Sequence, residues 1–157
     1  MFTKWWWFGF VFGTLVGLYL VTPAKADELW LTTGEWSRHV HDTNCPWPGA
    51  ACRPKYRQNN TGIGLEVKQS VDSSVLMGYY HNSVYRETVF GGMTYTPIHY
   101  SGVSLGIVGG LATGYTDKFP AVPIGGIFSS LEYKGVGMNI YWLPNVVTAI
   151  QFKIRIN

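Results

Sequence analysis

Charged residues are scarce in this sequence of 157 residues, since Asp, Glu, Lys and Arg make up 13% of it. An ordinary soluble domain has about 25%. The net formal charge of +3 is also small, which argues against a nucleic-acid partner bound through a strong overall positive field. Aromatic residues, in contrast, make up 16% of the chain. Few charges and many aromatic rings are typical of a surface that faces lipid.

Cysteine is nearly absent, because Cys45 and Cys52 are the only two. A zinc site built from cysteine pairs needs a second pair and a different spacing, so we expect no metal site, and we expect no cofactor. The two cysteines bracket a short segment rich in proline and glycine. In an exported protein, which folds in an oxidising environment, this arrangement predicts a disulfide between Cys45 and Cys52.

Export is predicted by the N-terminus, which has the three-part layout of a secretory signal peptide. Lys4 is followed by an almost wholly apolar stretch without charge, residues 5–21, and then by an Ala-x-Ala pattern that ends at Ala26. We therefore expect a signal peptide over residues 1–26 and one mature domain over residues 27–157. The alternative is an uncleaved membrane anchor, because the apolar stretch is close to the shortest helix that spans a bilayer.

Helical periodicity is also missing after Ala26. The chain instead shows runs of Val, Ile, Thr, Tyr and Phe with a period of two, separated by turn residues. In the last run the even positions from Val146 to Ile156 are mostly apolar, whereas Gln151, Lys153 and Arg155 alternate with them. This is the pattern of a membrane barrel strand, apolar towards lipid and polar towards the lumen. The runs lie at residues 28–40, 61–69, 74–83, 86–97, 101–113, 121–132, 135–143 and 146–156.

The runs predict an all-β fold, an eight-stranded antiparallel up-and-down barrel of the outer-membrane type. Eight is the smallest strand number of bacterial outer-membrane barrels. Each run is near the about 9–11 residues that a tilted strand needs to cross a bilayer, and closure removes sheet edges that lipid cannot hydrate. We expect a monomer in the outer membrane of a Gram-negative bacterium. The alternative is a soluble barrel, which would need a charged exterior and an apolar interior.

The connections divide between the two ends of this barrel. With both chain termini in the periplasm, those that follow odd-numbered runs face the outside, and the first of them, residues 41–60, is by far the longest. Along residues 101–113, small residues alternate with larger ones. They predict either room for a ligand in the lumen or only the close approach that tight curvature requires. Periplasmic turns are expected at residues 70–73, 98–100 and 133–134.

Polar residues that could perform chemistry gather at the predicted outer end. His39 and His41 end the first run, and Asn82 and Ser83 end the third. A histidine near a serine can act as a general base in acyl transfer, and an amide can stabilise an oxyanion. The same residues can equally be ordinary polar groups at the rim of a barrel.

The order and spacing of five short stretches are informative about the family. They are GIGL at 62–65, MGYYHNS at 77–83, LGIVGGLATG at 105–114, VPI at 122–124 and YWLPN at 141–145. Through them the sequence from Thr61 to Asn157 remotely resembles the outer-membrane lipid A palmitoyltransferases. The resemblance implies a barrel that takes an acyl chain from a phospholipid into its lumen and transfers it to lipid A. Phospholipid and lipopolysaccharide would then be its partners.

The resemblance also implies roles for individual residues. Ser83 matches the family's serine, and either His39 or His41 its histidine, but Asn82 stands where the family has an aspartate. Pro123 and Pro144 match prolines that interrupt strand pairing at lateral lipid entrances, because proline has no N–H for the ladder. The phosphates of lipid A would be held by a basic cluster in and beside the first outer loop. This cluster consists of Arg38, Arg53, Lys55 and Arg57.

Two hypotheses follow, a lipid A acyltransferase with an altered active site and a non-enzymatic barrel that serves membrane integrity, adhesion or surface exclusion. The first needs a rim histidine near Ser83 or Asn82 above a cavity. It fails if polar pairs, drawn from Lys153, Arg155, Glu66 and Glu132, fill the lumen from rim to base.

A second motif involves His99, Tyr100 and Ser101. It resembles the His-x-Ser motif of lipid A deacylases. Its position in the middle of the chain, near a predicted inner turn, leads us to interpret it as a coincidence.

Overall fold

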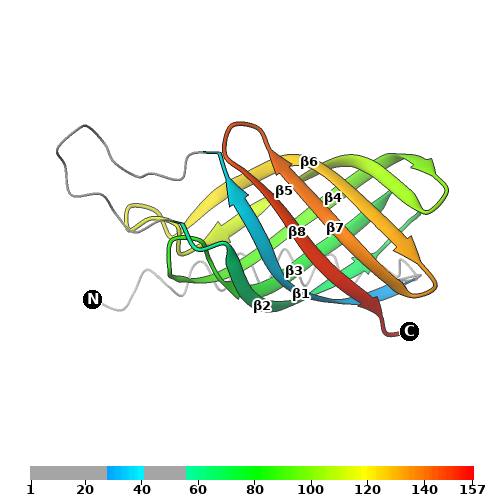
Figure 1. Cartoon of the computed structure of the whole chain (residues 1–157), viewed down its shortest axis with the longest axis horizontal. Helices are drawn as coiled ribbons and strands as arrows, with labels where there is room; N and C mark the ends of the chain where they lie inside the picture. The colour runs from blue at the N-terminus through cyan, green and yellow to red at the C-terminus, as the bar shows by residue number, and fades with distance from the viewer. Residues whose placement is uncertain (1–27, 41–55) are drawn as a thin grey trace.

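A computed structural model describes residues 28–40 and 56–157. Within these ranges the chain forms a closed antiparallel barrel in which each strand pairs with its neighbours in sequence and β1 pairs with β8 (Figure 1). None of the described segments is a helix long and apolar enough to cross a membrane. The strands are β1 Glu28–His39, β2 Asn59–Lys68, β3 Ser73–His81, β4 Glu87–Tyr100, β5 Val103–Thr113, β6 Ala121–Tyr133, β7 Val136–Leu143 and β8 Val147–Arg155.

The predicted fold, strand number and up-and-down order are confirmed. The end of β1 and the connections after β3, β5 and β7 lie together at one end of the barrel, which we call the loop end (Figure 1). The tighter turns after β2, β4 and β6 lie at the other end, beside the start of β1 and the end of β8, and we call it the turn end. This is the predicted division of the connections.

The two faces of the strands also follow the prediction. On β8, Gln151 and Lys153 are buried inside the barrel, whereas Phe152 and Ile154 are exposed on its outer surface. On β5 the small residues face inward, and they are needed for close approach of the backbone. A Cβ atom on Gly106 would lie 1.9 Å from the carbonyl oxygen of Tyr95. Close packing of neighbouring strands therefore explains this glycine. This agrees with the expectation that small residues here allow close approach of the backbone, and room for a ligand is not needed to explain Gly106.

Two β-bulges change the face that a strand presents to the lumen. In β1 the register shifts between Thr33 and Glu35, and in β4 it shifts between Tyr95 and Ile98. An extra residue at a bulge reverses the alternation beyond it. The periodicity of the sequence did not reveal either bulge.

The predicted inner turn at 98–100 is wrong, because β4 contains a bulge and continues through these residues. Residues Ile98 to Tyr100 pair with β5 and extend β4, with Tyr100 opposite Val103. The chain reverses instead at Ser101 and Gly102, whose φ angles are 47° and 81°. The bulge provides the extra residue that lets β4 continue to this turn.

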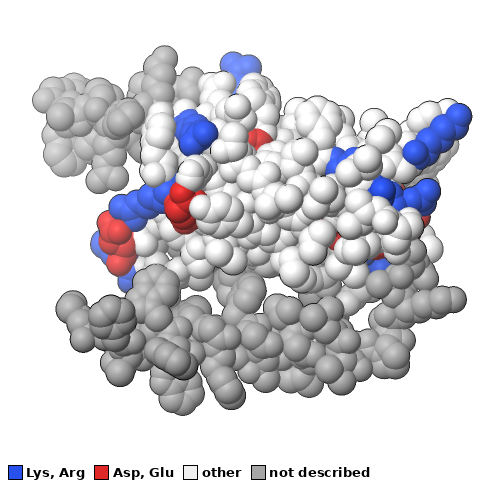
Figure 2. All heavy atoms as spheres, turned by 90° about the horizontal axis from the view of Figure 1, so that it is seen from below, with Lys and Arg blue, Asp and Glu red and all other residues white. Residues whose placement is uncertain are grey.

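The outer surface carries few charges between the two ends of the barrel. Figure 2 shows the Lys, Arg, Asp and Glu side chains gathered mostly towards the ends, with a largely uncharged middle. Exposed apolar side chains of this middle region, the outer belt, come from several strands. They include Ile63, Met93, Leu105, Ile107, Leu111, Ile127, Leu131, Trp142, Phe152 and Ile154.

Candidate functional site

A cavity of about 430 Å³ occupies the loop end of the lumen. Its lining includes four residues that the sequence analysis selected from distant parts of the chain. They are His39 of β1, Ser83 after β3, Pro123 of β6 and Pro144 after β7. The fold therefore brings these predicted residues to one hollow, and its volume is in the range typical of ligand pockets.

The bulge in β1 determines which residues of this strand reach the cavity. Before the bulge Trp30 and Thr32 are buried in the lumen, and beyond it Glu35, Ser37 and His39 line the cavity. Gly34 lies at the bulge, where a Cβ atom would be 2.1 Å from the carbonyl oxygen of Asn60. Only glycine fits there, so the bulge depends on this residue.

His39 and Ser83 share the cavity without a direct bond. The His39 ring stacks on Tyr56, with centroids 4.2 Å apart and an angle of 17° between the planes. Ser83 is 4% exposed, and its carbonyl oxygen accepts a hydrogen bond of 2.9 Å from the backbone N–H of Arg57. Among the hydrogen bonds within residues 28–40 and 56–157, none joins His39 to Ser83.

Asn82 is fully buried and organises the turn between β3 and β4. Its side-chain oxygen accepts hydrogen bonds from the backbone N–H groups of Val84 (3.0 Å) and Arg86 (2.9 Å). Its side-chain nitrogen donates to the hydroxyl of Thr88 (2.9 Å) and the carbonyl of Gly114 (3.2 Å). Both polar atoms of the side-chain amide are thus hydrogen-bonded within the turn. To stabilise an oxyanion, the side-chain nitrogen would have to break one of these hydrogen bonds.

The cavity wall is interrupted between β6 and β7. Their ladder ends at the pair Ile127 and Trp142, so residues 121–126 of β6 continue towards the loop end paired only with β5. Pro123 lies within this unpaired edge, and Pro144 follows the end of β7 directly. Both lack the N–H that would extend the ladder.

Tyrosines and one acid were missed by the sequence analysis. Tyr80, Tyr141 and Tyr115 line the cavity with Glu35, and the hydroxyl oxygens of Tyr80 and Tyr115 are 2.7 Å apart. Burial raises the pKa of Tyr115, in the loop after β5, to about 12, so the phenol stays protonated at neutral pH. The signal for Glu35 was Gly34, because a glycine in a strand can mark a bulge.

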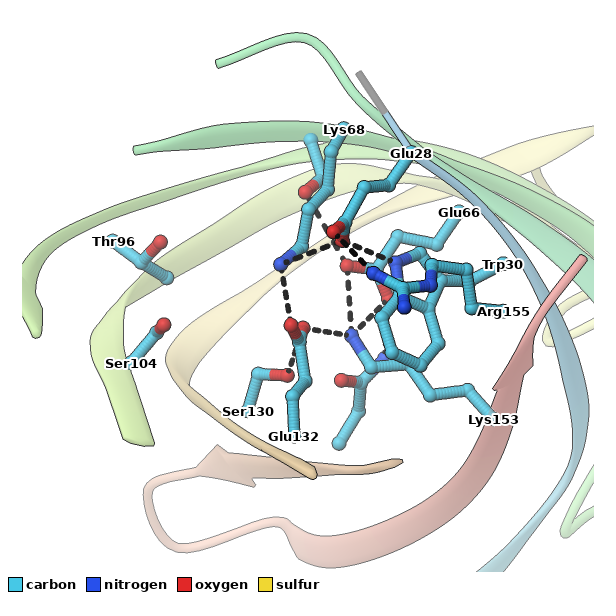
Figure 3. Close-up of polar contacts among 12 residues, drawn as sticks. Glu28, Trp30, Glu66, Lys68, Thr96, Ser104, Ser130, Glu132, Lys153 and Arg155 are labelled. Atoms are coloured by element: carbon cyan, nitrogen blue, oxygen red, sulfur yellow. Dashed lines mark hydrogen bonds and ion pairs between the residues drawn. The ribbon is translucent and has the colours of Figure 1, made fainter. Parts of the chain in front are cut away.

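A polar cluster fills the turn end of the lumen (Figure 3), and we call it the plug. Lys153 lies at its centre with a fully buried side chain, and its ammonium group is 2.9 Å from Glu66 Oε2 and 2.7 Å from Glu132 Oε1. Acidic and basic residues occur in equal numbers, so their formal charges cancel. The plug consists of Glu28, Trp30, Glu66, Lys68, Glu132, Lys153 and Arg155.

Trp30 packs against the cations of the plug. It is 1% exposed, and the charged groups of Lys153, Lys68 and Arg155 lie 4.7, 5.7 and 5.9 Å from its ring centroid. Polar pairs therefore fill the turn end only, and the loop end keeps its cavity. The geometry that would have excluded an acyl chain, a lumen packed from rim to base, is not present in the described barrel.

The basic residues of the predicted phosphate site are only partly described. Arg38 is exposed at the end of β1, and the Arg57 side chain donates to the carbonyl oxygen of Asn59 at 2.6 Å. The predicted signal peptide and several of the predicted site and disulfide residues lie outside the described ranges. These residues are His41, Cys45, Cys52, Arg53 and Lys55.

The other histidines contact acids. Outside the barrel, Nδ1 of His81 lies 2.7 Å from Oε1 of Glu87. At the turn end, His99 lies between Asp72 and Ser104. No group of three or more His, Cys, Asp or Glu side chains in the described part of the chain is arranged to hold a metal ion.

Comparison with known proteins supports the fold alone. No protein-family model and no curated protein matches the sequence. Among solved structures, the chain is similar to one from a study titled "De novo design of transmembrane beta-barrels". The match has a TM-score of 0.61 and 12% sequence identity, and it covers 84% of this chain and 98% of the other. The chain therefore shares the eight-stranded architecture of a transmembrane β-barrel.

Proposed function

We propose that this chain is a small integral β-barrel of the bacterial outer membrane whose loop end acts without catalysis, in membrane integrity or in contacts with other molecules. The observation that carries the proposal is the inversion of polarity between the two faces of the barrel. The outer belt is apolar, whereas the lumen contains buried ion pairs such as Glu66 with Lys153. A soluble barrel has the opposite arrangement.

The plug supports the proposal of a closed barrel and argues against an open channel. Trp30, Glu66 and Lys153 are all buried at the turn end, where they occupy the space that a channel would need. The loop end keeps an apolar cavity with polar groups at its wall. The plug thus separates the loop-end cavity from the turn end of the barrel.

A charge in the outer belt tests the membrane location. Ile107 lies near the middle of β5 and is 60% exposed, and Ile107→Arg places a guanidinium near the centre of the bilayer. We expect a loss of about 2–4 kcal/mol in the free energy of unfolding from phospholipid vesicles, measured by denaturant titration.

The matched control is Tyr100→Arg at the turn end, where the membrane interface is expected and Tyr100 is 82% exposed. Its cost should be about 0–1 kcal/mol. Equal effects of the two substitutions would contradict a barrel that crosses the membrane with this orientation of its strands.

The second candidate function is transfer of an acyl chain from a phospholipid to lipid A. It is favoured by one observation, the cavity that gathers His39 and Ser83 beside the unpaired edge of β6. Pro123 and Pro144 would provide lateral access for the lipid. For catalysis, His39 or His41 would have to approach Ser83 when the substrate binds, as hydrogen bonds of free active sites often tighten only in the complex.

Mass spectrometry of lipid A tests this second function. If it operates, cells that produce the chain contain lipid A heavier by one acyl group, and Ser83→Ala abolishes the change. Ser129→Ala, on the outer face of β6, is the control and should leave lipid A modification intact. Unchanged lipid A in cells with the folded native chain would exclude the acyltransferase function and leave the non-catalytic role of the loop end.

A further inference from the structure

Three side chains at the turn end form a connected chain of hydrogen bonds. The Oγ atom of Ser104 lies 3.0 Å from Nδ1 of His99, and Nε2 of the same ring lies 2.8 Å from Oδ1 of Asp72. A serine, a histidine and an acid joined in this order form the arrangement of a nucleophile, a general base and the group that orients the base. We propose that Asp72, His99 and Ser104 constitute a hydrolytic site for carboxylic esters, separate from the loop-end cavity.

The fold holds this arrangement through the bulge in β4. Before the bulge Thr94 and Thr96 face the lumen and are buried. Beyond it the alternation is reversed, so His99 lies directly opposite Ser104 in the β4–β5 register and on the same face. Ser104 projects from β5 into the turn end of the lumen (Figure 3). Without the bulge, the imidazole would face away from this serine.

Backbone contacts fix the acid as well. The backbone N–H of Thr96 donates a 2.7 Å hydrogen bond to the carbonyl oxygen of Asp72, and the hydroxyl of Ser70 accepts one of 3.2 Å from the backbone N–H of Asp72. The first bond ties the turn between β2 and β3 to β4, and the second lies within the turn. The carboxylate is therefore held where it can accept a hydrogen bond from Nε2–H of His99.

A second cavity, also of about 430 Å³, lies beside the three residues. His99 and Ser104 line it together with the charged side chains of Glu28, Lys68 and Glu132. Val71 and Tyr100, which are 78% and 82% exposed, add apolar surface at the turn end. Lys68 contacts both of these carboxylates, at 3.5 Å from Glu28 and 2.5 Å from Glu132, so its charge is balanced within the plug. An uncharged ester fits these surroundings, because its acyl group can contact Val71 and Tyr100 and it brings no further charge.

The reaction can be written with every proton assigned. Ser104 Oγ attacks the carbonyl carbon while His99 Nδ1 takes the hydroxyl proton, and Nε2–H donates to Asp72 throughout. The tetrahedral intermediate expels the alcohol, which receives the proton from His99, and leaves an acyl group on Ser104. Water then attacks this ester with the same base, which releases the acid and restores the serine, so the net change is ester plus water to acid plus alcohol.

Hydrolysis of p-nitrophenyl butyrate by the folded full chain in a non-ionic detergent tests the site. We expect turnover by the native chain, and a loss of at least about 100-fold in kcat for Ser104→Ala and for His99→Ala. Asp72→Asn should lower kcat and shift its pH profile with little change in KM, because the amide no longer fixes the tautomer of His99.

The control is Ser101→Gly, which removes a serine of the same cavity that has no part in the reaction, with a residue suited to its φ of 47°. It should keep native activity. A fluorophosphonate should label Ser104, as identified by peptide mass spectrometry, in chains that retain the heat-modifiable migration of a folded barrel. Hydrolysis that persists in Ser104→Ala, labelling of Ser101 or Ser83 instead, or a folded native chain that neither hydrolyses nor is labelled would overturn the proposal.

Discussion

Replacing Lys153 with methionine is expected to destabilise the barrel by about 3–5 kcal/mol, because it leaves Glu66 as a buried carboxylate without its cation. The ammonium group bonds both oxygens of Glu66, at 3.0 and 2.9 Å, and both side chains are at most 1% exposed. Glu132 also loses a partner but keeps Lys68, 2.5 Å away. Unfolding by denaturant from detergent micelles or vesicles measures the difference.

The double variant Glu66→Gln/Lys153→Met is the control for this prediction. It removes both charges and keeps side chains of similar volume, so it should recover most of the lost stability. If Lys153→Met alone costs less than about 1 kcal/mol, or if the double variant is no better than the single one, the pair is not the buried centre of the plug.

Trp30→Ala is expected to cost about 3–5 kcal/mol, the range for deleting a large buried aromatic side chain. The indole N–H donates to Glu28 Oε2 at 3.0 Å, and the ring face carries Lys153 at 4.7 Å from its centroid. The alanine therefore removes packing, a hydrogen bond and attraction between a cation and a ring together.

Trp36→Ala provides the comparison, because Trp36 lies on the same strand beyond the bulge and is 47% exposed on the outer face. In the same denaturant titration it should cost clearly less than Trp30→Ala. A larger effect at Trp36 would mean that the faces of β1 are reversed.

The sequence was sufficient to predict the architecture because a barrel in lipid imposes a simple rule on every strand. The alternation of β8 and of β7, with Met138 and Ile140 outside and Asn139 inside, could be read residue by residue. Regular pairing between neighbours then determined the topology. In the described barrel every pairing except the closing one, between β1 and β8, joins strands that are neighbours in sequence. Closure of the barrel was therefore the one long-range contact to predict.

The bulges account for most of what the sequence did not predict. A bulge changes which alternate residues of a strand face the lumen, and it does so through local backbone geometry. The bulge in β1 turns Glu35 inward, and the bulge in β4 places His99 beside Ser104, so the alternation of the sequence predicted neither. The end of β3 at His81 had a similar effect. Asn82 and Ser83 lie in the turn, where both are buried, so their faces did not follow the alternation of the strand.

The prolines illustrate the part of the site that could be predicted. Proline is incompatible with an internal ladder position for a reason that holds in any sheet, and the β6–β7 ladder does end before Pro123 and Pro144. The geometry between His39 and Ser83 could not be obtained in this way, because it depends on side-chain packing such as the stack of His39 on Tyr56.

Quenching of tryptophan fluorescence by brominated phospholipid chains tests the central claim, a barrel that presents its apolar face to lipid and its polar face to the lumen. Two variants are compared, each with one tryptophan retained and the others replaced by phenylalanine. Trp142 is 48% exposed on the outer face and Trp30 is 1% exposed in the plug. The account predicts strong quenching of Trp142 and little quenching of Trp30 in vesicles. Equal quenching of both, or none of Trp142, would contradict it.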